Sequence, residues 1–193
     1  MAKGQEQAAP DAVLTRIGQV AMLHHAGDRE EARLRFLSLW AEIGEHGDPL
    51  HRCTLAHYLA DTQDDPGDEL AWDLRALSAA EELADGAPAG RGGDGGEGEG
   101  GELAARALYP SLHLNLAADY DRLGHREAAR LHLRRARTAA GALAFDRYGE
   151  GVRAAIDRLA RRLADAGPTG DAGPPTDGPD RPDGWWGPPR QRP

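Results

Sequence analysis

The amino-acid sequence predicts an all-α fold, a solenoid of helical hairpins with about seven helices. Val, Ile and Thr together supply only 12 of the 193 residues, so the β-branched side chains that pack a substantial sheet are nearly missing. Apolar residues instead recur three and four positions apart along most of the chain, which is the period of an amphipathic helix. Sheet-based enzyme folds are therefore excluded.

The first hairpin is predicted from its apolar stripes and from the residues that interrupt them. Leu14 and Ile17 mark a helix that ends at Gly27, a residue suited to the left-handed conformation of a helix terminus. Asp28 then provides the N-cap of a second helix, which stops at Gly44.

The second hairpin carries the clearest start signals. Asp48 is an N-cap residue with Pro49 at the first helical position, where a missing amide hydrogen costs nothing. This helix is expected to reach about Asp61. Asp65 and the proline after it repeat the signal, and the next helix is expected to continue to Leu83.

Three further helices are predicted in the second half of the chain. Residues 103–108 form a short helical lead-in that is interrupted at Pro110, because proline removes a backbone hydrogen bond. From Pro110 the helical pattern runs to Gly124, and a new stripe runs over residues 128–143. A last helix is expected at about residues 150–166, with apolar residues on one face.

Two glycine- and proline-rich stretches bound the predicted helical domain. Residues 86–101 hold nine glycines and too little apolar surface to offset the entropy of ordering them, which predicts a flexible loop. The last 27 residues contain eight prolines and six glycines and cannot sustain a helix. We therefore expect a disordered N-terminus at 1–10, a domain at 11–166 and a disordered tail at 167–193.

The sequence also matches itself when it is shifted along its own length, at two different distances. A shift of 61 residues places Pro49 on Pro110, and a shift of 97 residues places Gly27 on Gly124. Three hairpins therefore share one template, and the spacing of the first two is close to the roughly 34 residues of a common helical repeat.

These motifs resemble the tetratricopeptide repeat family. Residues 116–120 match its Leu-Gly-x-x-Tyr pattern as Leu-Ala-x-x-Tyr, and residues 32–36 reproduce its Ala-x-x-x-Phe. The departures are that no repeat has the family's early Trp and that Leu59 replaces the Tyr of the second repeat. The resemblance covers about residues 11–140 as three divergent repeats, and the last helix is similar to the capping helix of such arrays.

The resemblance implies a concave groove that binds a peptide-like segment of a partner protein. The family register places in that groove residues of all three repeats: His24, His25, Cys53, His57, Asp61, Leu114, Asp121 and Arg122. We therefore expect a non-enzymatic adaptor for protein–protein interaction, with no cofactor, no resident metal and no catalytic residue.

An alternative function is a regulatory sensor that responds to a metal ion or a small ligand. Cys53, His57 and Asp61 share one face of their helix at i, i+4 and i+8. The same trio could form an activated nucleophile, or could hold a metal ion with His113 or His24 as a fourth ligand. However, the three groups are spread over about 12 Å along the helix, and no oxyanion donor is evident, which disfavours an enzyme. A buried or half-buried structural Cys53 is favoured over both.

The net charge and its distribution along the chain limit the classes of partner that the protein is expected to bind. The formal net charge of −9 opposes attraction to phosphates, which disfavours nucleic acid. Residues 61–102 contain 13 acidic and two basic residues, whereas residues 119–165 contain 11 arginines and seven acidic residues. The acidic stretch of one copy could contact the arginine-rich stretch of another, so association of two copies is an alternative. One helix also carries an arginine stripe, formed by Arg126, Arg130, Arg134 and Arg137.

The remaining signals concern location and the tail. Residues 1–11 contain no apolar run and no stretch is long enough to span a membrane, so a cytoplasmic protein is expected. A single lysine beside 22 arginines is typical of a GC-rich genome and favours a bacterial source. Trp185 and Trp186 could dock on a partner or on the protein's own groove.

Overall fold

A computed structural model describes the backbone of residues 11–85 and 97–165 and the side chains of 11–85 and 106–165. This part of the chain is all-helical and contains no strand. The helices are α1 (Ala12–His25), α2 (Arg29–Ile43), α3 (Pro49–Asp61), α4 (Pro66–Asp85), α5 (Glu97–Arg122), α6 (Arg126–Ala139) and α7 (Arg147–Asp165), with a 3₁₀ turn, η1 (Ala140–Ala142), after α6. The predicted all-α fold is confirmed.

Three predictions lie outside the described residues. They are the disordered N-terminus at 1–10, most of the predicted loop, at 86–96, and the tail at 167–193 with Trp185 and Trp186.

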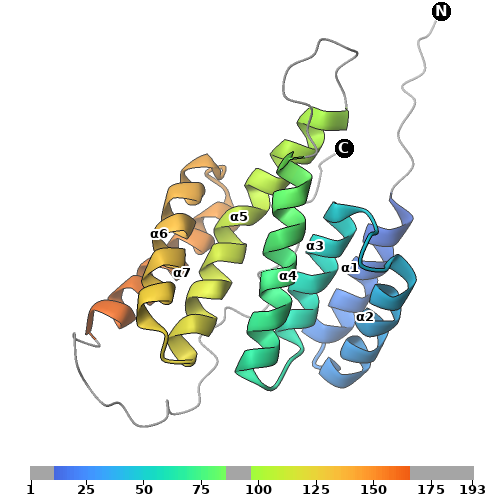
Figure 1. Ribbon diagram of the computed structural model, residues 1–193, viewed down its shortest axis with the longest axis horizontal. Coiled ribbons are helices and arrows are strands. Elements are labelled where there is room, and N and C mark those ends of the chain that lie inside the picture. The colour runs from blue at the N-terminus through green and yellow to red at the C-terminus, as the bar shows by residue number, and fades with distance from the viewer. Residues whose placement is uncertain (1–10, 86–96, 166–193) are drawn as a thin grey trace, which may run out of the picture.

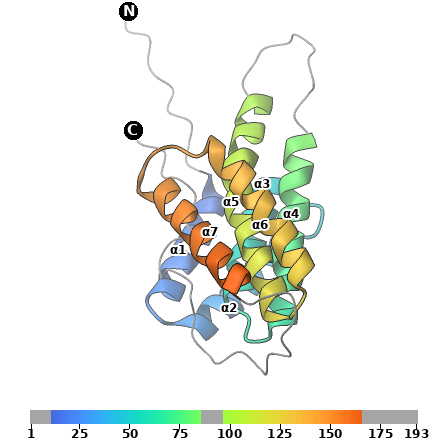
Figure 2. The same cartoon turned by 90° about the vertical axis from the view of Figure 1, so that its left-hand side faces the viewer.

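The helices form two layers that follow the order of the chain (Figure 1). Neighbouring helices pack as hairpins, α1 with α2, α3 with α4 and α5 with α6, and α7 packs on the last hairpin. Each odd-numbered helix also contacts the next odd-numbered one, whereas no two even-numbered helices of the described part pack together. The odd-numbered helices thus form one layer and the even-numbered helices cover it. The view turned by 90° shows α7 beside α5 and α6 (Figure 2).

Aspartates begin three of the helices. The Asp48 carboxylate accepts hydrogen bonds from the amides of Leu50 and His51, at 2.9 and 3.1 Å, which satisfies two amides that have no partner inside α3. Asp11 and Asp65 cap α1 and α4 in the same way. Asp28 occupies the N-cap position of α2, but its side chain makes no capping bond, so the predicted side-chain cap is absent there.

The turns after α1 and α5 have the same backbone geometry. Gly27 and Gly124 both adopt positive φ, +97° and +79°. The amide that follows each glycine bonds back to a carbonyl five residues earlier, Asp28 to Leu23 at 3.0 Å and His125 to Tyr120 at 2.8 Å. These pairs are 97 residues apart. The predicted 97-residue self-similarity is therefore present in the hydrogen bonds of the two turns.

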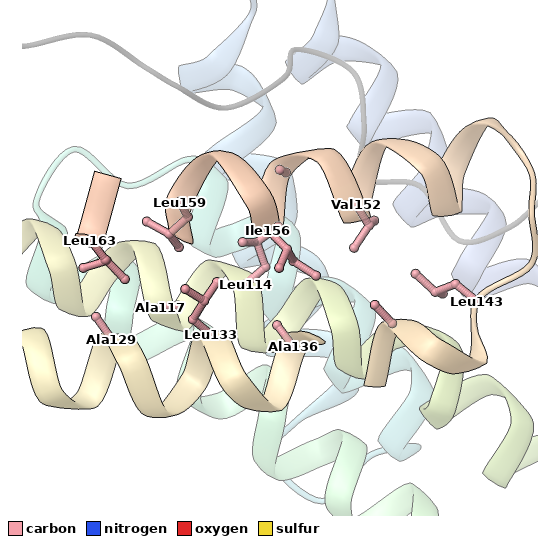
Figure 3. Close-up of a cluster of buried hydrophobic side chains, with 12 residues drawn as sticks. Leu114, Ala117, Ala129, Leu133, Ala136, Leu143, Val152, Ile156, Leu159 and Leu163 are labelled. Carbon is pink, nitrogen blue, oxygen red and sulfur yellow. The ribbon is translucent and has the colours of Figure 1, made fainter. Parts of the chain in front are cut away.

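Apolar side chains form three buried clusters in succession between the helices. The first lies between α1, α2 and α3 and stacks Phe36 on Tyr58 with ring centroids 5.5 Å apart. The second, between α3, α4 and α5, is built largely of alanines. The third joins α5, α6 and α7 around Leu133, Val152 and Ile156 (Figure 3). Full burial of such an aliphatic side chain contributes about 1.5–3 kcal/mol.

The structure corrects the predicted break at Pro110. Helix α5 continues through this residue as a single helix of 26 residues. Proline inside a helix costs about 3 kcal/mol. One feature favours continuity here: Pro110 is fully buried in α5, which packs against α4, α6 and α7. Tertiary packing thus overrides the local signal.

Three predicted boundaries are also wrong. Helix α5 begins at Glu97, inside the stretch expected to be a loop up to residue 101. Helix α6 ends at Ala139 and not near Leu143, because the chain tightens into η1 and Leu143 becomes extended. Helix α7 begins at Arg147, three residues before the predicted start.

Candidate functional site

Two of the three predicted groove residues on α3 are buried, and Asp61 at its end is half-buried. Cys53 is 0% exposed and His57 6% exposed, and every residue from Cys53 to Ala60 is buried. The reason is that α3 packs against α1, α2, α4 and α5 at once. Leu114 of α5 is likewise buried, in the cluster shared with α6 and α7. The expectation that Cys53, His57 and Leu114 present an open surface is therefore wrong.

The Cys53 thiol has the environment of an unreactive cysteine. It lies among alanines of α3 and α4 and beside Leu112 of α5. Burial, and secondarily the Asp73 carboxylate, raises the pKa of the thiol to about 12. The thiol is therefore protonated at neutral pH, whereas a nucleophile or a metal ligand requires the thiolate. Neither the predicted alternative nucleophile nor a thiolate metal site fits this environment.

His57 belongs to a buried polar cluster that joins three helices. Its Nδ1 atom lies 3.6 Å from a carboxylate oxygen of Asp73 on α4 and 3.5 Å from the side-chain nitrogen of Asn115 on α5. Glu69 and Asp119 complete the cluster, and both are buried. One carboxylate oxygen from each of Glu69, Asp73 and Asp119 lies within 4.8 Å of the others.

Arg122 bridges two of these carboxylates. Its guanidinium donates to Asp119 at 2.7 Å and also to Glu69. Of the residues predicted for the groove, Arg122 and His57 are thus brought to the same cluster, where Arg122 pairs with two buried carboxylates and His57 lies beside Asp73. Carboxylate oxygens in this arrangement could also hold a hard cation such as Mg²⁺ or Ca²⁺. Removing one partner of such a network is strongly destabilising, because it leaves an uncompensated buried charge.

Sequence reasoning missed this carboxylate cluster, although one signal was present. Glu69 and Asp73 are four residues apart on α4, and Asn115 and Asp119 are four residues apart on α5. Each pair therefore interrupts a helix face with polar side chains. That the two pairs face one another depends on how α4 packs on α5.

The other predicted groove residues lie at the C-terminal ends of helices. His24 is half-buried and His25 is exposed in the last turn of α1, with ring centroids 5.8 Å apart. Asp61 is half-buried at the end of α3. Asp121 accepts a hydrogen bond from Arg162 of α7 at 2.9 Å, so it ties two helices together.

An open, shallow depression of about 470 Å³, called here the α5–α6 cavity, lies between α5 and α6. Two residues of α5 and five of α6 line it: Tyr109, His113, Leu131, Arg134, Arg135, Thr138 and Ala139. Arg134 and Arg135 are exposed, and neither pairs with a carboxylate of the described residues.

Two other arginines of the predicted stripe on α6, Arg130 and Arg137, make contacts that Arg134 does not make. Arg130 donates to the carbonyl of Leu163 at 3.4 Å, and Arg137 lies 3.6 Å from the Asp157 carboxylate. These two arginines contact α7. The stripe is thus divided between an internal contact and the wall of the α5–α6 cavity.

His113, which lines this cavity, forms a buried pair with His132. His113 and His132 are 9% and 7% exposed, and their Nδ1 atoms are 3.2 Å apart. Burial, then His132, then Arg135 lower the pKa of His113 to about 4. Burial, followed by Arg135, also lowers the pKa of His132. Both imidazoles are therefore neutral at physiological pH.

A second groove, of about 340 Å³, lies between α1 and α2. Its two arginines are already paired, Arg16 with Glu42 and Arg35 with Glu31, each at 2.7 Å. The α5–α6 cavity therefore differs from it in having arginines that no carboxylate of the described side chains neutralises.

Comparison of the chain with protein-family models, with curated proteins and with solved structures finds no match in any of the three. Within the described residues, no helix combines the length and the apolar character that crossing a bilayer requires. Only the geometry and chemistry of the site therefore bear on the function of the protein.

Proposed function

We propose that the protein is a non-enzymatic interaction protein that binds a peptide-like segment of a partner, and that this segment is acidic. The observation that carries the proposal is the α5–α6 cavity with two arginines, Arg134 and Arg135, that pair with no carboxylate within 11–85 and 106–165. This surface differs from the groove expected across α1, α3 and α5, in which Cys53, His57 and Leu114 are buried.

The chemistry of the cavity suits a carboxylate beside an apolar side chain. A guanidinium forms two parallel hydrogen bonds with a carboxylate, which gives both energy and geometry. Leu131, which is 39% exposed, and Ala139 offer apolar contact next to Arg134 and Arg135. A cavity of this size falls at the lower end of the range for ligand pockets, so it accommodates part of a segment.

The test compares two double variants in affinity purification from the native source. Arg134→Ala with Arg135→Ala removes the cavity charges, whereas Arg147→Ala with Arg158→Ala removes two exposed charges from α7 as a matched control. We expect the first variant to recover at least about tenfold less partner than the wild type, since contacts to charged groups contribute about 1.5–3 kcal/mol each.

Equal recovery with both variants would contradict the proposal. A third variant, His25→Ala with Asp61→Ala, tests the surface implied by the family resemblance. If only this variant loses the partner, the protein is an adaptor that binds at the C-terminal ends of α1 and α3.

The geometry lends less support to a sensor centred on Cys53 and His57. The thiol is protonated and faces alanines, and His57 is directed to Asp73 and Asn115. The same protonated thiol argues against a cysteine-based enzyme.

A further inference from the structure

We propose that His113 and His132 form a two-imidazole binding site for a zinc ion beside the α5–α6 cavity, which His113 lines. The rings come from adjacent antiparallel helices and direct their Nδ1 atoms toward each other. This site does not involve Cys53, and it is separate from the cluster of Glu69, Asp73 and Asp119.

The distance between the two nitrogen atoms fits a shared metal ion. Zinc binds histidine nitrogen at about 2.0–2.1 Å with tetrahedral geometry, which places two ligand nitrogens about 3.3 Å apart. The Nδ1 atoms of His113 and His132 are 3.2 Å apart. An ion could therefore replace the hydrogen bond between the rings without a large movement of either helix.

Neighbouring aromatic rings hold both imidazoles in place. Tyr109 stacks on His113 with ring centroids 6.0 Å apart and an interplanar angle of 17°. Tyr120 lies against His132 at 5.4 Å. Ligands whose orientation is already fixed lose little freedom when the metal binds, which raises affinity.

The protonation state of the rings also suits a metal. A histidine ligand must be neutral, and burial lowers the pKa of both rings so that they are neutral at pH 7. The tautomer that carries hydrogen on Nε2 leaves the Nδ1 lone pair for the metal. Imidazole ligands suit zinc, copper and nickel, and we choose zinc because it accepts tetrahedral coordination.

The cavity supplies the rest of the coordination sphere. His113 lines the cavity, so two coordination positions would face it and take water or an anion. Arg135 opposes a cation at this site. An anion held in the cavity by Arg134 and Arg135 would offset that repulsion, and a carboxylate of a bound segment is one such anion. The zinc site does not depend on the proposed partner.

Titration of the full-length protein with zinc chloride, in a buffer that does not chelate zinc, tests this site. Calorimetry should give one saturable site per chain, and saturation should raise the melting temperature. His113→Gln and His132→Gln should each weaken binding at least about tenfold, as even outer-shell changes do in zinc sites. His125→Gln, which changes an exposed histidine at the start of α6, should bind as the wild type does.

A second measurement on the wild-type protein guards against variants that fail to fold. Long-range nitrogen NMR should show zinc shifting the Nδ1 resonances of His113 and His132 and of no other histidine. The proposal is overturned if the wild type shows no saturable zinc binding, or if zinc shifts other histidines instead. Loss of zinc binding in Asp73→Asn, with binding retained in His132→Gln, would also overturn it and would place the metal at the carboxylate cluster.

Discussion

Cys53 and His57 show how neighbouring helices decide the chemistry of a side chain. The sequence places the two residues one turn apart on a single helix face. In the structure the thiol is surrounded by apolar side chains, whereas His57 lies 3.6 Å from the Asp73 carboxylate. The residue types and their spacing allowed a reactive pair but favoured a structural cysteine. The side chains supplied by α4 and α5 make one of them inert and engage the other in a polar cluster.

His113 should make the stability of the protein depend on pH. Its pKa is about 4 in the folded protein and returns to about 6.5 when the chain unfolds. Between these values the unfolded state binds more protons, so the free energy of unfolding falls as the pH is lowered. We expect a loss on the order of 2 kcal/mol between about pH 7 and about pH 4.5, measured by urea unfolding followed by circular dichroism.

His113→Gln is the control for this pH dependence, because carboxylates also titrate at the acidic end of the range. The variant lacks the proton-binding group, so its free energy of unfolding should fall less than that of the wild type over the same interval. Parallel curves for the two proteins would show that His113 contributes nothing to the pH dependence.

Among the secondary-structure elements, the hairpin turns are the best-defined repeated feature. Gly27 and Gly124 occupy equivalent positions with positive φ and equivalent hydrogen bonds. Gly18, by contrast, is exposed in the middle of α1, and a Cβ added there would meet no atom within 4 Å. The same residue type is thus required by the backbone in the turns and only tolerated in the helix.

This contrast predicts opposite effects of one substitution at two sites. Gly27→Ala should destabilise the protein by about 1 kcal/mol, because a side chain strains the left-handed backbone. Gly18→Ala should stabilise it by about 0.5–1 kcal/mol, since glycine is a poor helix former. Urea unfolding of the two variants measures both changes. A loss of stability in Gly18→Ala, or no loss in Gly27→Ala, would be inconsistent with the described turn.

Over the whole molecule, the three apolar clusters form one connected interior. Trp40 and Trp72 meet edge to face at 5.0 Å and border both the first and the second cluster. Helix α5 carries Leu112 into the second cluster and Leu114 into the third. Because each cluster shares helices with the next, we expect the described helices to unfold as one cooperative unit.

Cys53 reports on this unit, since its thiol is 0% exposed in the central cluster. We expect a thiol reagent to modify Cys53 at least about a thousandfold more slowly in the native protein than in concentrated urea, as global stabilities of 5–15 kcal/mol imply. Absorbance of the released reagent product gives both rates. Rapid modification without loss of helicity would mean that the layer around α3 opens locally.

The sequence predicted the helices more accurately than it predicted the candidate site. Asp48, Pro49 and Gly27 act on the backbone within a few residues of themselves, so their signals identify where elements start and stop without knowledge of the fold. The predicted break at Pro110 was wrong because the burial of this residue among the other helices outweighs the free-energy cost of a proline inside a helix. The carboxylate cluster was missed because Asp73 and Asp119 come together only when α4 packs on α5.

The chain's composition and periodicity were therefore enough to establish an all-helical protein built of hairpins, because helix formation and turn geometry depend on residues close in sequence. The surroundings of each polar side chain depended on packing between helices. This packing buried His57, divided the arginines of α6 between α7 and the cavity, and brought His113 within 3.2 Å of His132. Such contacts join residues far apart in the chain, and local patterns carry no information about them.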